Sequence, residues 1–338
     1  MAKFNVAVVG CGGMARKWVE GALRRDDCEI VAFVDINAEN AERYRNEFGV
    51  GQTFTDVRTA IGATGTNLVF DVTIPESHFT VVTTALEMGC DVFGEKPMAH
   101  SIDAARRVIE TVERTGRTYS VMQNRRYIKN IRALGEAVTS GVIGEPGFIC
   151  ADFFIGAHFG GFREAMDSPL ILDMAIHTFD QARFITGKDP VAVYCHEFNP
   201  KGSWYKGNAS AVCIFEYADG SVFNYRGSWS AEGHPTSWEA EWRIVGSKGT
   251  AMWDGKNAPY CEVVIPPQER VFLNSYNRVE AETTWTGREY HDGCFDEMFA
   301  ALIEGRPAET DCRDNIKSVA MVYGAIESAR TGKKVILG

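Results

Sequence analysis

The residues best suited to chemistry lie in two separate stretches of the chain. The first, residues 6–15, reads VAVVGCGGMA, so Gly10, Gly12 and Ala15 have the spacing G-x-G-x-x-A. In this pattern the first glycine permits a tight turn and the second lets a pyrophosphate approach the backbone, while the last small residue allows close helix–strand packing. A glycine triplet alone is weak evidence, because glycine-rich turns between strands and helices are common.

The next apolar segment strengthens this interpretation. Residues 30–34 read IVAFV and are followed by Asp35, about where a second strand offers a carboxylate to a ribose 2′-hydroxyl. We therefore predict a dinucleotide site, formed by Gly10, Gly12, Gly13, Met14, Asp35 and Ile36. Asp35 would repel a 2′-phosphate, so NAD is the expected cofactor, although Arg43 and Arg45 lie close enough in sequence to leave NADP possible.

The second stretch, residues 170–180, reads LILDMAIHTFD. On a regular α-helix Asp173, His177 and Asp180 share one face, because they are spaced i, i+4, i+7. Three interpretations stay open on local grounds: a core histidine held by two carboxylates, a Mn or Zn site, and a general base oriented by the aspartates. A nicotinamide cofactor favours the last, since alcohol oxidation needs a group that takes the hydroxyl proton.

Two loops that follow predicted strands are further candidates. In Thr73–His78 (TIPESH), helix capping and cofactor contact are equally good interpretations. In Gly94–Pro97 (GEKP), the proline keeps Lys96 out of helical geometry, at the strand end where open α/β sheets bind ligands. A surface lysine is an equal alternative there.

Strand and helix patterns alternate in residues 1–124. Expected strands lie near 4–9, 29–35, 67–73, 91–94 and 118–122, and expected helices at 37–48, 78–88 and 102–115. This alternation predicts an α/β domain with a doubly wound parallel sheet.

The pattern after residue 124 is different and predicts a second, α+β domain spanning 125–338. Expected strands lie at 148–155, 191–198, 209–217, 221–230 and 238–245, in an open, mainly antiparallel mixed sheet. Helices are expected at 130–140, 290–304 and about 313–331, the last a candidate to pack back on the first domain. Alternating aromatic residues suggest that a partner subunit covers one sheet face.

Bulk composition excludes several classes of protein. The 338 residues carry a formal net charge of −10, which argues against nucleic-acid binding. No apolar run is long enough to span a bilayer. The nine cysteines are scattered without a C-x-x-C pair, so no disulfide framework or thiolate metal site is expected, and the expected compartment is a reducing cytoplasm.

These residues together resemble the Gfo/Idh/MocA oxidoreductase family. The likeness covers the whole chain and rests on the glycine pattern and four further motifs: Thr73-x-Pro75-x-x-His78, Glu95-Lys96-Pro97, Gly144-Glu145-Pro146 and Asp173-x-x-x-His177-x-x-Asp180. Many members carry glycine two residues before the histidine, where this chain has Ala175. The resemblance implies an N-terminal Rossmann domain and a C-terminal domain whose open mixed sheet makes oligomer contacts, hence a homodimer or homotetramer.

The resemblance also implies an activity: NAD(P)-dependent oxidation of a secondary hydroxyl on a sugar, inositol or related polyol. Carried over by position, His177 is the acid/base, Lys96 assists proton transfer and holds the hydroxyl, and Asp173 orients the substrate. The remaining expected cofactor contacts are Thr73, Pro75, His78, Glu95 and Lys96, and the remaining expected substrate contacts are Arg125, His158, Arg163 and Asp180. Two alternatives within the family are an NAD-dependent glycosidase that oxidises its substrate transiently and a non-catalytic dinucleotide-sensing regulator.

Overall fold

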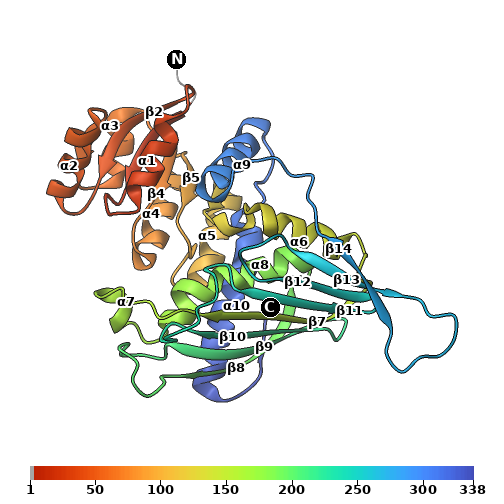
Figure 1. The fold of residues 1–338 in the computed structure, drawn as a ribbon. Helices are drawn as coiled ribbons and strands as arrows, with labels where there is room; N and C mark the ends of the chain where they lie inside the picture. The colour runs from red at the N-terminus through yellow and green to blue at the C-terminus, as the bar shows by residue number, and fades with distance from the viewer. Residues whose placement is uncertain (1–3) are drawn as a thin grey trace. The chain divides into compact units, whose positions relative to one another are not determined.

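The computed structural model describes residues 4–338, which form two compact units (Figure 1). The first unit contains residues 4–124 and Arg288–Val319, and the second contains Arg125–Gly287 and Ala320–Gly338. The segment 288–319, which the sequence pattern placed in a second domain, thus groups with the first unit. None of the helices in residues 4–338 has the length and apolar character needed to cross a membrane.

The first unit is built on a six-stranded parallel sheet with the strand order β3-β2-β1-β4-β5-β6. Its strands are β1 (Phe4–Val9), β2 (Cys28–Val34), β3 (Gln52–Phe54), β4 (Leu68–Asp71), β5 (Asp91–Gly94) and β6 (Tyr119–Val121). Its helices include α1 (Ala15–Leu23), α2 (Ala38–Phe48), α3 (Val57–Thr64), α4 (Pro75–Glu87), α5 (Ile102–Thr115) and α9 (Tyr290–Glu304). This order is that of the doubly wound dinucleotide-binding fold, and the predicted parallel sheet is confirmed.

Aromatic packing explains why α9 belongs to the first unit. The ring centroid of Phe295 lies 4.9 Å from that of Trp18 in α1, and that of Phe299 lies 5.0 Å from that of Phe93 in β5. All four rings are buried, so α9 supplies part of this core. Strand β3 and helix α3 were absent from the prediction, because β3 has only three residues and lies at the sheet edge, where the apolar pattern is weak.

The second unit is built on a nine-stranded sheet with the order β14-β13-β12-β11-β7-β10-β9-β8-β15. Its strands are β7 (Pro146–Phe154), β8 (Pro190–Phe198), β9 (Ser210–Tyr217), β10 (Val222–Ser228), β11 (Glu241–Gly246), β12 (Gly249–Trp253), β13 (Tyr260–Ile265), β14 (Ser275–Glu280) and β15 (Val335–Ile336). Only the β7–β10 pairing is parallel, which confirms the predicted mainly antiparallel mixed sheet. The last four strands were not predicted; β12 and β15 have only five and two residues, and β14 is exposed at every residue.

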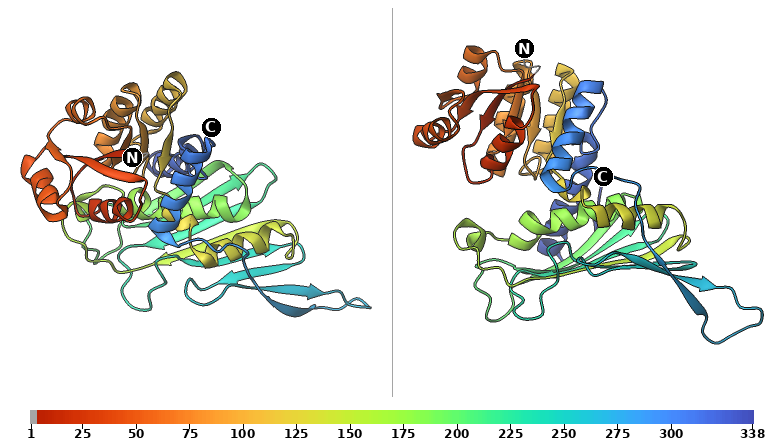
Figure 2. Two further views of the ribbon diagram at one scale, coloured as in Figure 1. Left: turned by 90° about the horizontal axis from the view of Figure 1, so that it is seen from above. Right: turned by 45° about the horizontal axis from the view of Figure 1, so that its top comes forward.

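The two faces of this second sheet differ in what covers them. Helices α6 (Lys129–Thr139) and α8 (Ile176–Thr186) lie along one face, above a buried core (Figure 2). On the opposite face, residues that alternate with buried ones along β7, β9 and β11 are partly or fully exposed, and several of them are apolar. We define the outer sheet face by its exposed apolar residues Phe148, Tyr194, Val212, Ile214 and Val245.

The segment that carries Asp173 and His177 is not a regular α-helix throughout. Residues Leu170–Ala175 form a π-helical turn that runs directly into α8. A π-turn takes more residues than an α-turn, so the expected i, i+4 alignment of Asp173 with His177 does not hold. His177 and Asp180 both lie within α8 and keep their α-helical spacing.

A half-buried glutamate lies beside the start of this π-turn. Ser168 Oγ donates a hydrogen bond of 3.0 Å to Oε2 of Glu197, on strand β8. The other carboxyl oxygen of Glu197 is buried and has no hydrogen-bond partner among residues 4–338. Burial accordingly raises the pKa of Glu197 to about 7.

We expect Glu197 to make the stability of the protein depend on pH. Its pKa is raised on folding, so its contribution is complete below pH 4.5 and is lost as pH rises through 7, by up to about 3 kcal/mol. Urea unfolding of Glu197→Gln should therefore show a gain in the free energy of unfolding at pH 8 and almost none at pH 5. Glu241→Gln, which alters an exposed glutamate of the same sheet, is the control. An equal difference at both pH values would contradict this prediction.

Candidate functional site

The glycine turn after β1 needs glycine at one position and leaves open space at the next two. Gly10 has φ +91°, and a Cβ there would lie 2.6 Å from the carbonyl oxygen of Val72. A Cβ on Gly12 or Gly13 would meet nothing within 4 Å. The backbone of Gly12 and Gly13 is therefore accessible to a ligand that approaches closely.

Helix α1 begins directly after this turn. Met14 is its N-cap residue, and no side chain caps the helix there. A helix N-terminus presents backbone N–H groups and a partial positive charge, which together favour an anion such as a pyrophosphate. The uncapped helix start and the open glycine backbone fit the predicted dinucleotide site.

The side chain of Asp35, directly after β2, and two side chains of α2 form hydrogen bonds with the backbone of the glycine turn. The N–H of Cys11 donates to Oδ2 of Asp35 at 2.9 Å. Arg43 Nη2 donates to the carbonyl oxygen of Cys11 at 2.9 Å, and the hydroxyl of Tyr44 donates to the carbonyl oxygen of Gly12 at 2.5 Å. Asp35 thus orients the loop in addition to its expected ribose contact. The role of Tyr44 was not predicted, because its position in the sequence is that of an ordinary core residue on α2.

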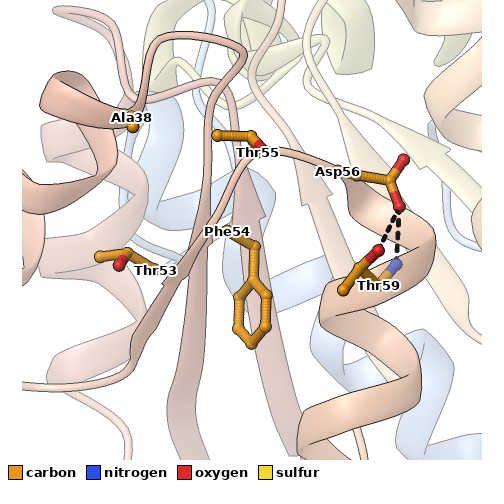
Figure 3. Close-up of a pocket in the computed structure, with 6 residues that line it drawn as sticks. All are labelled: Ala38, Thr53, Phe54, Thr55, Asp56 and Thr59. Atoms are coloured by element: carbon orange, nitrogen blue, oxygen red, sulfur yellow. Dashed lines mark hydrogen bonds between the residues drawn. The ribbon is translucent and has the colours of Figure 1, made fainter.

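A shallow pocket lies near Asp35 in the first unit. Ile36, which follows Asp35 in the sequence and was predicted to contact the cofactor, is 97% exposed. The pocket has a volume of about 290 Å³ and is lined by Ala38, Thr53, Phe54, Thr55, Asp56 and Thr59 (Figure 3). Asp56 accepts hydrogen bonds from the backbone N–H and the hydroxyl of Thr59, so its carboxylate caps helix α3 (Figure 3). The pocket lies on the side of the sheet edge where the adenosine half of a dinucleotide binds in this fold.

Two of the three predicted cofactor residues after β4, Thr73 and His78, are bound to a buried aspartate. Asp71 ends β4, and its Oδ1 accepts the Thr73 hydroxyl at 2.6 Å, while its Oδ2 lies 2.8 Å from Nδ1 of His78. Burial opposes a charged imidazole, but the Asp71 carboxylate outweighs it and raises the pKa of His78. Pro75 occupies the first turn of α4, whose N-cap residue Ile74 makes no side-chain cap hydrogen bond, so the side-chain capping interpretation is wrong.

The loop after β5 places Glu95 between two donors. The indole Nε1 of Trp18 donates to Oε1 of Glu95 at 2.8 Å, and the backbone N–H of Lys96 donates to Oε2 at 3.2 Å. Burial raises the pKa of Glu95 in spite of these bonds. Lys96 is followed by Pro97 through a cis peptide bond. Glu95 thus anchors the backbone of the predicted catalytic lysine, and Trp18, an unpredicted member of the site, anchors Glu95.

In the second unit Asp173 pairs with Arg163. Arg163 Nε donates to Oδ2 of Asp173 at 2.6 Å, with side chains 36% and 18% exposed. The guanidinium lies over the rings of Phe159 and Phe162, 5.1 and 4.8 Å from their centroids. The structure thus brings two predicted substrate residues together in a partly exposed ion pair. His177, the second residue of α8, is buried.

Asp180 lies in a different environment from Asp173. Both of its oxygens accept bonds of 2.7 Å from Arg126, with Arg183 3.6 Å from Oδ1, and all three side chains are buried. A buried carboxylate with bidentate partners is costly to unpair. Asp180 therefore serves the internal packing of the second unit, and the pattern of the sequence did not indicate Arg126 as its partner.

The remaining predicted substrate residues also have partners within the second unit. Arg125 Nη1 lies 3.4 Å from Oε2 of Glu239. His158 Nε2 lies 2.7 Å from Oε1 of Glu232, and its ring stacks on Trp204 with centroids 3.7 Å apart. Among residues 4–338, no group of three or more His, Cys, Asp or Glu side chains is arranged to hold a metal ion, and none of the nine cysteines forms a disulfide.

Comparison with known protein families agrees with this arrangement. Residues 4–123 match the model of an oxidoreductase family with an NAD-binding Rossmann fold, and residues 131–252 match the GFO/IDH/MocA C-terminal domain. The chain therefore belongs to the Gfo/Idh/MocA family of oxidoreductases, and its first unit is an NAD-binding Rossmann domain.

The chain is also similar to individual dehydrogenases and to solved structures. The chain is 26% identical over 353 residues to D-apiose dehydrogenase of Paraburkholderia graminis, covering 99% of this chain and 90% of that protein. It is 25% identical over 190 residues to myo-inositol 2-dehydrogenase of Thermotoga maritima, covering 56% of this chain and 57% of that protein. A solved structure of an oxidoreductase from Agrobacterium radiobacter with NAD+, L-tartaric acid and magnesium shares the fold, with a TM-score of 0.86, 24% identity, and 100% and 99% of the two chains covered.

We expect alanine at Gly10 to lower the stability of the protein and alanine at Gly12 to weaken cofactor binding. Gly10→Ala should lower the free energy of unfolding by about 1–3 kcal/mol, because its methyl group meets the Val72 carbonyl. Gly12→Ala should leave stability within about 0.5 kcal/mol and weaken NADH binding at least about tenfold, because its methyl group occupies the space of the pyrophosphate.

Urea unfolding and NADH fluorescence titration separate these two effects. Gly62→Ala, in open space on helix α3, is the matched control and should bind NADH normally. Unchanged NADH affinity in Gly12→Ala would show that the pyrophosphate does not bind over this turn.

Proposed function

We propose that this protein is an NAD-dependent dehydrogenase that oxidises a secondary hydroxyl of a sugar, inositol or related polyol. Its two characterised relatives above act on an apiose and an inositol, which supports this substrate class. The observation that carries the proposal is the presence of a lysine anchored at the end of β5 and a histidine in the helix segment that also bears Asp173. A regulator that only senses the dinucleotide needs neither residue.

In this proposal each residue has a defined task. NAD, when bound, supplies the acceptor for the hydride. His177 takes the hydroxyl proton, and the ammonium group of Lys96 binds and polarises the same hydroxyl. Asp173 orients the substrate, and because its pair with Arg163 is partly exposed, a substrate hydroxyl can replace the guanidinium as a donor. Asp180 is assigned to packing.

The preference for NAD over NADP rests on Asp35. Its carboxylate lies at the end of β2, held by the N–H groups of Cys11 and Asn37, each at 2.9 Å. Arg43, the nearest candidate partner for a 2′-phosphate, is bound to the Cys11 carbonyl instead. The negative charge of Asp35 disfavours the 2′-phosphate.

We further propose that the outer sheet face forms a contact between copies of this chain, as a homodimer or homotetramer. Tyr194 lies opposite Ile214 on the neighbouring strand, and Phe148 lies opposite Val245. These apolar side chains are 36–47% exposed on an otherwise regular sheet. Exposed apolar groups that cluster on one face are typical of protein–protein contacts.

Lys96→Ala and His177→Ala should each lower kcat/KM at least about 100-fold on any accepted sugar, because each removes a group that acts on the transferred proton. The assay is NADH formation with a panel of aldoses, glucosides and inositols, run with NAD and with NADP. Lys256→Ala removes an exposed lysine and is the control.

Product analysis beside the absorbance assay tests the glycosidase alternative. Release of free sugar from a glycoside without accumulation of NADH would establish that alternative. Full turnover in either variant would remove the corresponding residue from the proposed mechanism.

Ile214→Lys should dissociate the oligomer, because it places a charge in the middle of the outer sheet face. Analytical ultracentrifugation of both proteins measures the effect. The control is Ile303→Lys, on α9 of the first unit. Ile303 is 46% exposed and Ile214 is 38% exposed, and this variant should leave the mass of the oligomer unchanged. A monomeric parent protein, or an Ile214→Lys variant with the parent's mass, would contradict this assignment.

A further inference from the structure

Cofactor binding does not account for two buried charged groups in the first unit. Asp71 and His78 are 0% and 1% exposed, and they pair through Oδ2 and Nδ1 at 2.8 Å. The second ring nitrogen of His78, Nε2, is buried and has no hydrogen-bond partner among residues 4–338. A buried ion pair contributes little to stability by itself, so its presence calls for another role.

The surroundings of His78 favour its charged form. Burial opposes the imidazolium, but the carboxylate of Asp71 and, more weakly, those of Glu95 and Glu76 outweigh it, so the pKa of His78 is raised. The Asp71 carboxylate, 2.8 Å from Nδ1, thus favours the imidazolium form of His78. The same aspartate accepts the backbone N–H of Glu95 on its carbonyl oxygen at 2.9 Å, which links His78 to the residue that anchors Lys96.

His78 also lowers the pKa of Glu95, beside the contributions of Trp18 and Lys96. Burial raises its pKa, while the Trp18 indole, the charge of Lys96 and the charge of His78 each lower it. The ionised carboxylate accepts a bond on each oxygen, from the Trp18 indole and from the Lys96 N–H. Protonation would place a hydrogen on one of these acceptors and release one of the two bonds.

We propose that His78 is a positioning residue: held as an imidazolium by Asp71, it keeps Glu95 in its carboxylate form and so fixes the backbone of Lys96. Charges then alternate along the row Asp71, His78, Glu95 and Lys96, from the end of β4 to the end of β5. The part of this inference that concerns turnover rests on the proposed dehydrogenase function. The charge states of His78 and Glu95 do not depend on it.

The other groups around this row do not compete for the proton. Thr73 donates its hydroxyl to Asp71. Tyr119, from β6, faces Asp71 and Glu95, and burial raises its pKa well above the usual value, so it stays neutral. Glu76 lies on α4 with His78 but is exposed, where solvent screens its charge. His78 and Glu95 are therefore the two groups of this row whose protonation the proposal concerns.

Nuclear magnetic resonance of the full chain tests the charge states without any turnover. With 15N-labelled histidine, both ring nitrogens of His78 should carry protons at pH 7.5. With 13C-labelled glutamate carboxyl groups, the Glu95 midpoint should move up by about one pH unit in His78→Gln, a tenfold change in proton affinity. His78→Gln and Glu95→Gln assign the two signals.

Two results would overturn the proposal: a neutral His78 at pH 7.5, or an unshifted Glu95 midpoint in the variant. If His78→Gln does not fold, Asp71→Asn replaces it. The loss of this partner should lower the midpoint of His78 in the same spectra. These spectra require no turnover. They therefore test the charge states of His78 and Glu95 even if the protein oxidises no sugar and the proposed function is wrong.

The pH dependence of kcat/KM on an accepted sugar then tests the link to Lys96. In His78→Gln the acidic limb should move about one pH unit higher, while activity recovers toward alkaline pH. Glu76→Gln, an exposed carboxylate of the same helix, should leave the limb in place. A uniform loss of kcat in His78→Gln at every pH would show a merely structural role and would contradict the proposal.

Discussion

The close approach of the glycine turn to the strand next to it is the constraint on which the nucleotide site depends. Gly10 donates its N–H to the Val34 carbonyl at 2.8 Å, and its Cα faces Val72 so closely that a Cβ would lie 2.6 Å from the carbonyl oxygen. The turn, the end of β2 and the β4–α4 loop are therefore positioned by one another. A displaced turn would also displace the loop that begins with Thr73.

Carboxylates are used differently within the second unit. Asp180 accepts hydrogen bonds on both oxygens from Arg126, and both side chains are buried, which makes the pair part of the packing. Asp173, seven residues earlier, forms a partly exposed ion pair with Arg163, and replacing that partner with another donor costs little. The difference in burial supports our proposal that Asp173 contacts the substrate and that Asp180 does not.

Much of the site followed from local pattern. The glycine spacing, the carboxylate of Asp35 at a strand end and the Glu95-Lys96-Pro97 motif are readable without a structure, because they depend on backbone geometry over a few residues. The alternation of strands and helices predicted the parallel sheet for the same reason. The regular-helix expectation for Asp173 and His177 was wrong, since side-chain types do not reveal a π-turn.

What the sequence by itself determined is the class of fold and the residues able to do chemistry, because apolar periodicity and turn residues act over short distances. Only the tertiary structure decided the partners of those residues. Trp18 reaches Glu95 across 77 positions, Arg126 reaches Asp180 across 54, and Tyr44 reaches Gly12 across 32. Such pairs arise when packing brings distant segments together, and no local pattern of residue types encodes the distance between them.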